Sequence, residues 1–455
     1  MNDSPITTKF ACPRCDAPIH ATKSGYECGG CDTQFPRLED TPFLFAEPGV
    51  ALDEWRQRYH SRQREIEHAL VGLSASLAQS EADSPANARI QREHDALTAH
   101  QAELGALLAP LDVTSMAADH SSYLAMRTRL PDDQGLVTYY ANLHRDWCWG
   151  DEENRLSCEQ VAGALQETPV GEMLVLGAGG GRLAYDLHQM LDNPLTVALD
   201  FNPLLMLAGS ALAGGKTLAL HEFPIAPRRA EDVAVARQLE APGKAREGLH
   251  WVLANVLRAP FKPASFDTLV TPWLCDVLDE PLHVQAQRWN RLLRKGGRWV
   301  WFGSHVFRSK RVEEQHSLEE TMAIIEAAGF GDLTLEESDI PYMVSPANRH
   351  ARQERIITLT MTKQADTETP ARHVALPDWL VRGDLPVPTN QSFQSQGMAS
   401  RIHAFFFSMI DGERSLEDMA TLMEQENLMS KAEGIAALRN FMIRVLAESE
   451  GYSTF

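Results

Sequence analysis

The sequence predicts an α/β protein built around a Rossmann-like parallel β-sheet, and three stretches of the chain carry this prediction. The first, Met173–Asp200, joins an apolar run of strand length to a glycine-rich turn, a helical pattern and a second apolar run. The second, Ala259–Val270, places a polar turn before a strand. In the third, Arg291–Phe302, we expect a helix to end at Lys295 and a strand to follow the turn at Gly296-Gly297.

The second and third stretches fall where the class I S-adenosylmethionine (SAM) methyltransferases have their fourth and fifth strands, and the chain resembles that superfamily. In the first stretch, Gly177, Gly179 and Gly181 allow a tight turn and a close approach of a ligand to the backbone. Asp200 ends the next strand, where an acid can accept hydrogen bonds from ribose hydroxyls. The GxGxG spacing suits SAM better than NAD, because a dinucleotide site more often reads GxGxxG.

Composition limits the other functions. The 455 residues, of which 44% are apolar, can form roughly two to four domains with real cores. The formal net charge of −20 disfavours a nucleic-acid partner, because an acidic surface repels phosphate backbones, although a local basic patch is compatible with it. The chain has neither a signal-peptide pattern nor an apolar run long enough to cross a membrane. We therefore expect a cytoplasmic protein without a membrane partner.

Four of the seven cysteines form two CxxC pairs near the N-terminus. Cys12 and Cys15 lie in CPRC, and Cys28 and Cys31 lie in CGGC. Two such pairs can hold Zn²⁺ with four thiolates, whereas a reducing cytosol disfavours the alternative of two disulfides. Four thiolates leave no open coordination position, so we expect a structural zinc ion. The module resembles the zinc ribbons at the head of some bacterial rRNA methyltransferases.

Changes of pattern along the chain predict four domains. Residues 1–48 form the zinc ribbon, 49–130 a helical hairpin, 131–365 the SAM-dependent methyltransferase domain and 366–455 a winged-helix-like helical domain. Two apolar stripes at helical spacing predict the hairpin. Its opposite face is solvated, or the hairpin serves as a spacer or a homodimer contact. The last domain contains IDGERSLEDMA, which resembles the small peptide-carrying domain of the pyrroloquinoline quinone pathway. Its acidic helices favour a lid, a dimer contact or peptide recognition over DNA binding.

A narrower resemblance covers residues of about 139–363. This part begins with RDW, continues through an acidic turn and a helix to LVLGAGGGRLAYDL, and later contains HEFPIAPRR and GGRWVWFG. The order resembles the carnosine N-methyltransferase family, in which RDW precedes an ER pair and a VPGAGLGRL-like glycine turn. The resemblance implies N-methylation of an amine or imidazole in a small molecule or short peptide.

The same resemblance implies which residues bind SAM. Arg145 of RDW matches a residue that contacts SAM, and its guanidinium can fork onto the methionyl carboxylate; alternatively, it forms an ion pair with Asp146 or Glu152. Asp200 stands where the family has Glu, and Asn255-Val256 stand where it has the Asp and Phe of a GDF run. The implied cofactor-binding residues are Arg145, Gly177, Gly179, Gly181, Asp200, Asn255 and Val256.

Three catalytic residues are implied on the substrate side. Asp276 matches an aspartate at the end of the fourth strand, which can hold a cationic amine or accept an imidazole N–H; alternatively, it and Asp279 cap a helix that begins near Pro281. His305 lies near the position of the family's histidine, and is alternatively a hydrogen-bonded loop residue. Tyr342 falls in a YMV run that resembles the family's YTV, and is alternatively a half-buried structural residue.

Three functions therefore remain open. The first is a small-molecule or short-peptide N-methyltransferase. The second is a methyltransferase that acts on a protein or RNA presented by the zinc ribbon and the C-terminal domain. The third is a non-catalytic SAM-binding scaffold, which the departure at Asn255-Val256 favours.

Overall fold

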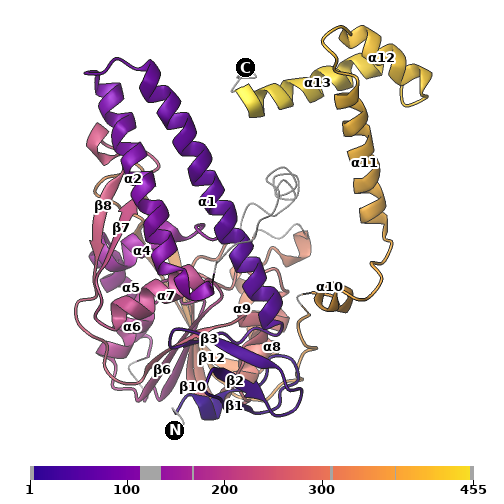
Figure 1. Ribbon diagram of the computed structural model, residues 1–455. Coiled ribbons are helices and arrows are strands. Elements are labelled where there is room, and N and C mark those ends of the chain that lie inside the picture. Colours follow the sequence, from indigo (N-terminus) through magenta and orange to yellow (C-terminus); the bar gives the residue numbers. More distant parts are fainter. Residues whose placement is uncertain (1–4, 113–134, 166–168, 308–310, 375, 451–455) are drawn as a thin grey trace. The chain divides into compact units, whose positions relative to one another are not determined.

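The computed structural model describes residues 5–112, 135–165, 169–307, 311–374 and 376–450 (Figure 1). The chain divides into two compact units, Met1–Val374 and Ala375–Phe455.

A mixed seven-stranded sheet forms the centre of the first unit and confirms the predicted α/β class. Five neighbouring strands are parallel, and the last two pair antiparallel at one edge. In spatial order the strands are β12 (Phe330–Tyr342), β13 (Arg352–Lys363), β11 (Leu293–Gly303), β10 (Phe266–Pro272), β5 (Glu172–Leu176), β6 (Leu195–Asp200) and β9 (Leu249–Leu253). Parallel strands buried on both faces need continuous apolar runs, and the apolar stretches of the sequence became these strands.

Helices cover both faces of the sheet. Alternate residues of β5 enter different apolar clusters, because successive side chains of a strand point to opposite faces. Met173 and Val175 pack with the helices shown on one side of Figure 1, and Leu174 and Leu176 pack with those on the other. The helices on the face of Met173 and Val175 are α4 (Tyr140–His144), a π-helix (Arg145–Trp149), α5 (Asp151–Gly163), α6 (Arg182–Met190) and α7 (Pro203–Ala213). Those on the face of Leu174 and Leu176 are α8 (Leu282–Leu292) and α9 (Leu318–Ala327).

One predicted boundary is wrong. The helix expected to end at Lys295 ends at Leu292, and β11 begins at the next residue. Leu292 and Leu293 are both buried, so the chain passes from the helix into the sheet without an intervening loop. Gly296 has a positive φ within the strand, where the sequence indicated the turn.

A small antiparallel sheet forms the N-terminal ribbon, as predicted. Its strands are β1 (Ile19–Ala21), β2 (Gly25–Cys28), β3 (Gln34–Leu38) and β4 (Thr41–Pro42). The ribbon is attached to the large sheet, because Phe43 bridges in parallel to Leu253 and the Leu44 amide donates to the Leu253 carbonyl at 2.7 Å. Phe10 also packs against Phe261, with ring centroids 5.9 Å apart.

The predicted helical hairpin is confirmed as α1 (Pro48–Gln79) and α2 (Pro85–Leu107). Ser84 caps α2 by accepting a hydrogen bond from the Asn87 amide, so the predicted break is also a helix start. The tops of the two helices in Figure 1 extend beyond the sheet. At the other end, Trp55 packs on Phe201, and α2 contacts the hairpin of β7 (Leu218–Glu222) and β8 (Val235–Leu239).

Short 3-10 helices complete the first unit: η1 (Thr7–Lys9), η2 (Ala109–Leu111), η5 (Ala230–Asp232), η6 (Val256–Arg258) and η7 (Val312–Glu314). Across the described residues of the whole chain, no helix combines the length and apolarity that crossing a bilayer requires.

The second unit is helical. It contains α10 (Asp378–Arg382), α11 (Gln391–Ser408), α12 (Leu416–Gln425) and α13 (Lys431–Glu450). Ser415 and Asp418 form a capping box at the start of α12, and Phe406, Met423 and Leu438 lie in the unit's apolar core. The helical prediction is confirmed, but residues 376–450 contain no strand that could form a wing.

We expect Leu104→Ala to destabilise the hairpin strongly. Leu104 is fully buried, and removing such a leucine side chain costs about 2–5 kcal/mol through lost transfer energy and the cavity left behind. Urea unfolding of the full chain, followed by circular dichroism, should show an earlier transition. Val71→Ala is the control, because Val71 is 69% exposed on the same hairpin and its truncation should change stability by less than about 0.5 kcal/mol.

Candidate active site and metal cluster

The glycine turn lies at the carboxyl end of β5, in contact with Asp200 at the end of the neighbouring strand. Gly177, Gly179 and Gly181 all have positive φ, which explains the choice of glycine. The Gly179 amide donates to Asp200 Oδ2 at 2.9 Å, and the Asn202 amide donates to Oδ1 at 2.9 Å. Burial raises the pKa of Asp200, while these amide donors oppose the rise.

The three glycines differ in the space beside them. A Cβ at Gly181 would lie 2.1 Å from the Trp251 ring, and one at Gly177 would lie 2.8 Å from Leu274. At Gly179, no heavy atom lies within 4 Å of that position. Side chains therefore fill the space beside Gly177 and Gly181. The space beside Gly179, whose amide donates to Asp200, is open.

The RDW segment, Arg145–Trp147, packs against the glycine turn. Trp147 is buried, and its indole N–H donates to the Gly180 carbonyl at 3.0 Å. A Cβ at Gly180 would lie 2.7 Å from Asp146 Oδ2, so the backbone of the turn is in close contact with this carboxylate. Arg182, at the start of α6, donates to the Asp146 carbonyl at 2.6 Å. Asp146 and Trp147 are thus structural parts of the site that the sequence interpretation did not select, although both lie in the motif that it quoted.

Arg145 forms an ion-paired cluster beside them. Its guanidinium contacts Asp146 at 2.7 Å and Glu153 at 2.9 Å. This is the ion-pair alternative, with Glu153 in place of Glu152. Burial lowers the pKa of Arg145, but the two carboxylates raise it by more, so the net shift is upward. Glu153 also accepts from the Met343 amide at 2.9 Å, which joins α5 to the end of β12.

Asp276 and His305 come together at the carboxyl ends of β10 and β11. Asp276 Oδ2 accepts from the Val306 amide at 2.9 Å, while Oδ1 is buried without a hydrogen-bond partner among the described residues. The helix-cap alternative is excluded, because α8 has Pro281 at its N-cap and no side-chain cap. His305 Nε2 lies 2.8 Å from Thr321 Oγ1, and burial lowers the pKa of the imidazole, against the opposing charge of Asp276.

Tyr342 belongs to a different group of side chains. Its ring packs against Trp273, with centroids 4.7 Å apart, and the Arg352 and Arg145 guanidinium carbons lie 4.7 Å and 5.9 Å from its centroid. Burial raises the pKa of the phenol. Trp273 directly follows β10 with φ of +50°, a conformation that is uncommon for a residue with a side chain and often marks a functional site. No hydrogen bond between described residues joins Tyr342 to Asp276 or His305.

Asn255 and Val256 follow β9, next to the strand that ends in Asp200. The Asn255 side chain caps the short helix η6 by accepting from the Leu257 amide at 2.9 Å. Val256 is buried in the apolar cluster on the ribbon side of the sheet. Their implied role in binding the cofactor stays a prediction, as does the SAM contact of Arg145.

Away from this site, Cys12, Cys15, Cys28 and Cys31 form a cluster that can hold a metal ion. All four sulfur atoms lie within 4.8 Å of one another, with Sγ···Sγ distances of 3.7 Å and 3.3 Å for two of the pairs. With Zn–S bonds of about 2.3 Å, tetrahedral geometry requires S···S distances of about 3.8 Å. The amides of Arg14 and Gly30 donate to Cys12 and Cys28 sulfur atoms, and such donors stabilise thiolates.

No model of a known protein family matches this chain, and no curated protein matches its sequence. Solved structures do match about half of it. The YcgJ protein of Bacillus subtilis is 12% identical over 46% of this chain and 99% of its own, with a TM-score of 0.33. A SAM-dependent methyltransferase of Thermotoga maritima, described as a possible histamine N-methyltransferase, is 14% identical over 49% of this chain and 99% of its own, with a TM-score of 0.29.

A third match is the phosphoethanolamine N-methyltransferase 2 of Haemonchus contortus, solved with SAM. It is 15% identical over 45% of this chain and 44% of its own, with a TM-score of 0.29. The strand order of this chain itself shows an α/β sheet with five neighbouring parallel strands and an antiparallel pair at one edge.

We expect the reduced full-length protein to contain about one zinc ion per chain, because the four sulfur atoms match a closed tetrahedral site. Metal analysis of Cys15→Ser should show that most of this zinc is lost, and the ribbon should unfold at a lower temperature. Cys148→Ser, which removes a thiol outside the cluster, is the control and should retain the metal. Zinc-free wild-type protein would contradict the four-thiolate site.

Proposed function

We propose that this protein is a SAM-dependent methyltransferase that methylates a nitrogen atom of an amine or imidazole in a small molecule or short peptide. Within this proposal, SAM supplies a methyl group that its sulfonium already activates. The chain then has to bind the donor, orient the acceptor, exclude water and accept a proton.

The position of the glycine turn supports a nucleoside site. The chain runs from β5 to β6 and β9 on one side of the sheet and continues with β10 and β11 on the other, so the switch point of the sheet lies between β5 and β10. Open α/β sheets bind ligands at this point, outside the carboxyl ends of the strands. The turn at Gly177–Gly181 and the segment that contains Asp276 follow the two strands at this switch point.

The residues beside the turn fit SAM. The open space at Gly179 allows a ligand to approach the backbone, and the buried Asp200 carboxylate is the acceptor that ribose hydroxyls require. Backbone amides hold both Asp200 oxygens in place, and a carboxylate offers about four acceptor sites, so it can also accept from a ligand. Arg145 and Asn255 are proposed as additional contacts, to the methionyl carboxylate and to adenine.

One observation carries the choice of a nitrogen acceptor: the buried Oδ1 of Asp276 has no partner within the described chain. A buried carboxylate oxygen without a hydrogen bond is costly, and an N–H or ammonium group would satisfy it. Asp276 would accept that proton or hold the amine, so that a lone pair on nitrogen is free to attack the methyl group. His305 lies beside it, and burial lowers the pKa of its imidazole, which favours the neutral form of the ring.

The tetrathiolate cluster has a structural role in this proposal. Four sulfur ligands close the coordination sphere of zinc, so the ion holds the ribbon together and takes no part in methyl transfer. We propose no nucleic-acid or membrane partner.

We expect Gly179→Ala to weaken SAM binding while leaving the fold intact. Its φ of +57° costs an alanine about 1–2 kcal/mol, and the added methyl group would enter the open space beside Asp200. Gly296→Ala is the matched control, because Gly296 has φ of +76° with open space but lies in β11. Calorimetry should show that the affinity for SAM falls tenfold or more in Gly179→Ala and is unchanged in Gly296→Ala. Asp200→Ala should show the same loss, and undiminished SAM affinity in both variants would refute the cofactor site.

Asp276→Asn should abolish methyl transfer and spare SAM binding. The substitution keeps the shape of the side chain but removes the charge, and losing a proton acceptor commonly slows a reaction by about 10²-fold or more. The assay incubates the protein with methyl-labelled SAM and fractionated cell extract and follows label into small molecules. Asp279→Asn, an exposed aspartate in the same segment, should retain activity. Label that enters protein or RNA instead would identify a macromolecular acceptor.

A further inference from the structure

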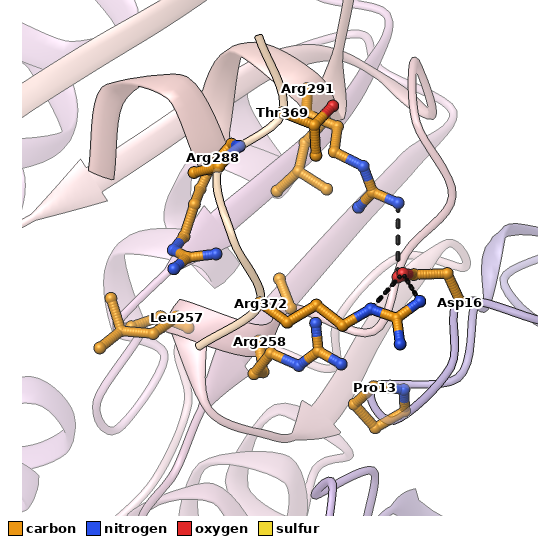
Figure 2. A pocket seen from close by; sticks show the side chains of 12 residues that line it. Pro13, Asp16, Leu257, Arg258, Arg288, Arg291, Thr369 and Arg372 are labelled. Carbon is orange, nitrogen blue, oxygen red and sulfur yellow. Dashed lines mark hydrogen bonds and ion pairs between the residues drawn. The ribbon is translucent and has the colours of Figure 1, made fainter. Parts of the chain in front are cut away.

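A pocket on the first unit has four arginine side chains among its lining residues (Figure 2). Four separate segments meet there: the first cysteine knuckle of the ribbon, the segment around η6, helix α8, and the stretch that follows β13. The lining residues are Pro13, Asp16, Val256, Leu257, Arg258, Ala259, Arg288, Arg291, Leu292, Thr369, Pro370 and Arg372.

Two of the arginines share one carboxylate. Figure 2 shows Arg291 and Arg372 converging on Asp16. Arg291 Nη2 lies 3.4 Å from Asp16 Oδ1, and Arg372 Nη2 lies 2.8 Å from Oδ2. Arg372 also donates to the Arg14 carbonyl at 3.0 Å, which joins the stretch after β13 to the ribbon.

The other two arginines differ in their partners. Arg288 forms a two-point contact with Glu280, at 2.8 Å for each hydrogen bond. Arg258 is half-buried and donates a hydrogen bond to the Arg14 carbonyl at 3.1 Å. No carboxylate within the described residues pairs with it. The four guanidinium groups are therefore balanced by two carboxylates, Asp16 and Glu280.

This excess of positive charge is costly within the protein. Burial lowers the pKa of Arg258, as do the neighbouring Arg372 and Arg288 cations, whereas Asp16 and Cys12 oppose them. A partly desolvated cation without a carboxylate in contact with it is costly, and an anionic ligand that binds it lowers this cost. The whole chain has a formal net charge of −20, so the local concentration of arginines does not follow from its general composition.

We propose that this pocket binds a phosphate group, either as free phosphate or as the phosphate ester of a small molecule. Planar guanidinium groups match the oxygen atoms of phosphate with paired hydrogen bonds, and Arg258 supplies the donors that have no carboxylate partner. The site is distinct from the glycine turn, and the proposal does not depend on methyl transfer.

Calorimetry of the full-length chain with inorganic phosphate tests this directly, with chloride at matched ionic strength as the blank. Wild type should bind about one phosphate per chain, and Arg258→Gln should weaken binding about tenfold. Arg355→Gln is the matched control: it removes the same charge from an exposed arginine that pairs with Asp339 outside the pocket. Equal weakening by both variants would show a general charge effect and overturn the proposal, as would the absence of wild-type binding.

Asp16→Asn gives a second test with the opposite sign. It frees Arg291 and Arg372 from their shared carboxylate, so phosphate affinity should rise several-fold. Asn suits this position because Asp16 has φ of +64°, which asparagine tolerates well. Reduced or unchanged affinity would contradict the proposal. So would tight binding of a short single-stranded RNA that depends on Arg258 while inorganic phosphate has no effect, because the ligand would then be a nucleic acid.

Discussion

The candidate active site depends on the parallel pairing of β5 with β6 on one side and β10 on the other. Leu174 pairs with Val197 in one register and with Leu269 in the other, so the carboxyl ends of three strands meet at one edge. The glycine turn, Asp200 and Asp276 each follow or end one of these strands. Their proximity is therefore a consequence of sheet register and not of local sequence.

Buried charge is concentrated around this edge. Arg145, Asp146 and Glu153 form a cluster of one cation and two anions, and Asp200 is buried with only backbone donors. Such groups cost free energy on folding unless their hydrogen bonds are complete, so they rarely serve packing alone. Perturbed acids gathered at the switch point of an α/β sheet are typical of a ligand site.

The N-terminal ribbon is held to the large sheet by more than its apolar core. Leu44 continues the hydrogen bonding at the β9 edge, and Lys9 forms an ion pair of 2.6 Å with Glu172 at the start of β5. The arginine pocket lies at this junction, because Asp16 of the ribbon binds Arg291 of α8 and Arg372. The ribbon that contains the four-cysteine cluster thus also forms one wall of the proposed phosphate site.

Local pattern determined much of this protein. Continuous apolar runs predicted the buried strands, the glycine turn with Asp200 predicted the βαβ unit, and the cysteine spacing predicted the four-sulfur cluster, because each feature lies within a short stretch of chain. The boundary at Lys295 was wrong because a buried Leu292-Leu293 pair continues directly from helix to sheet, which periodicity does not reveal. Only the tertiary structure paired Arg145 with Glu153 and placed Trp147 against the glycine turn. It also left one oxygen of Asp276 without a hydrogen-bond partner among the described residues. It also assembled the arginine pocket from four distant segments, since contacts between such segments depend on how the elements pack in three dimensions.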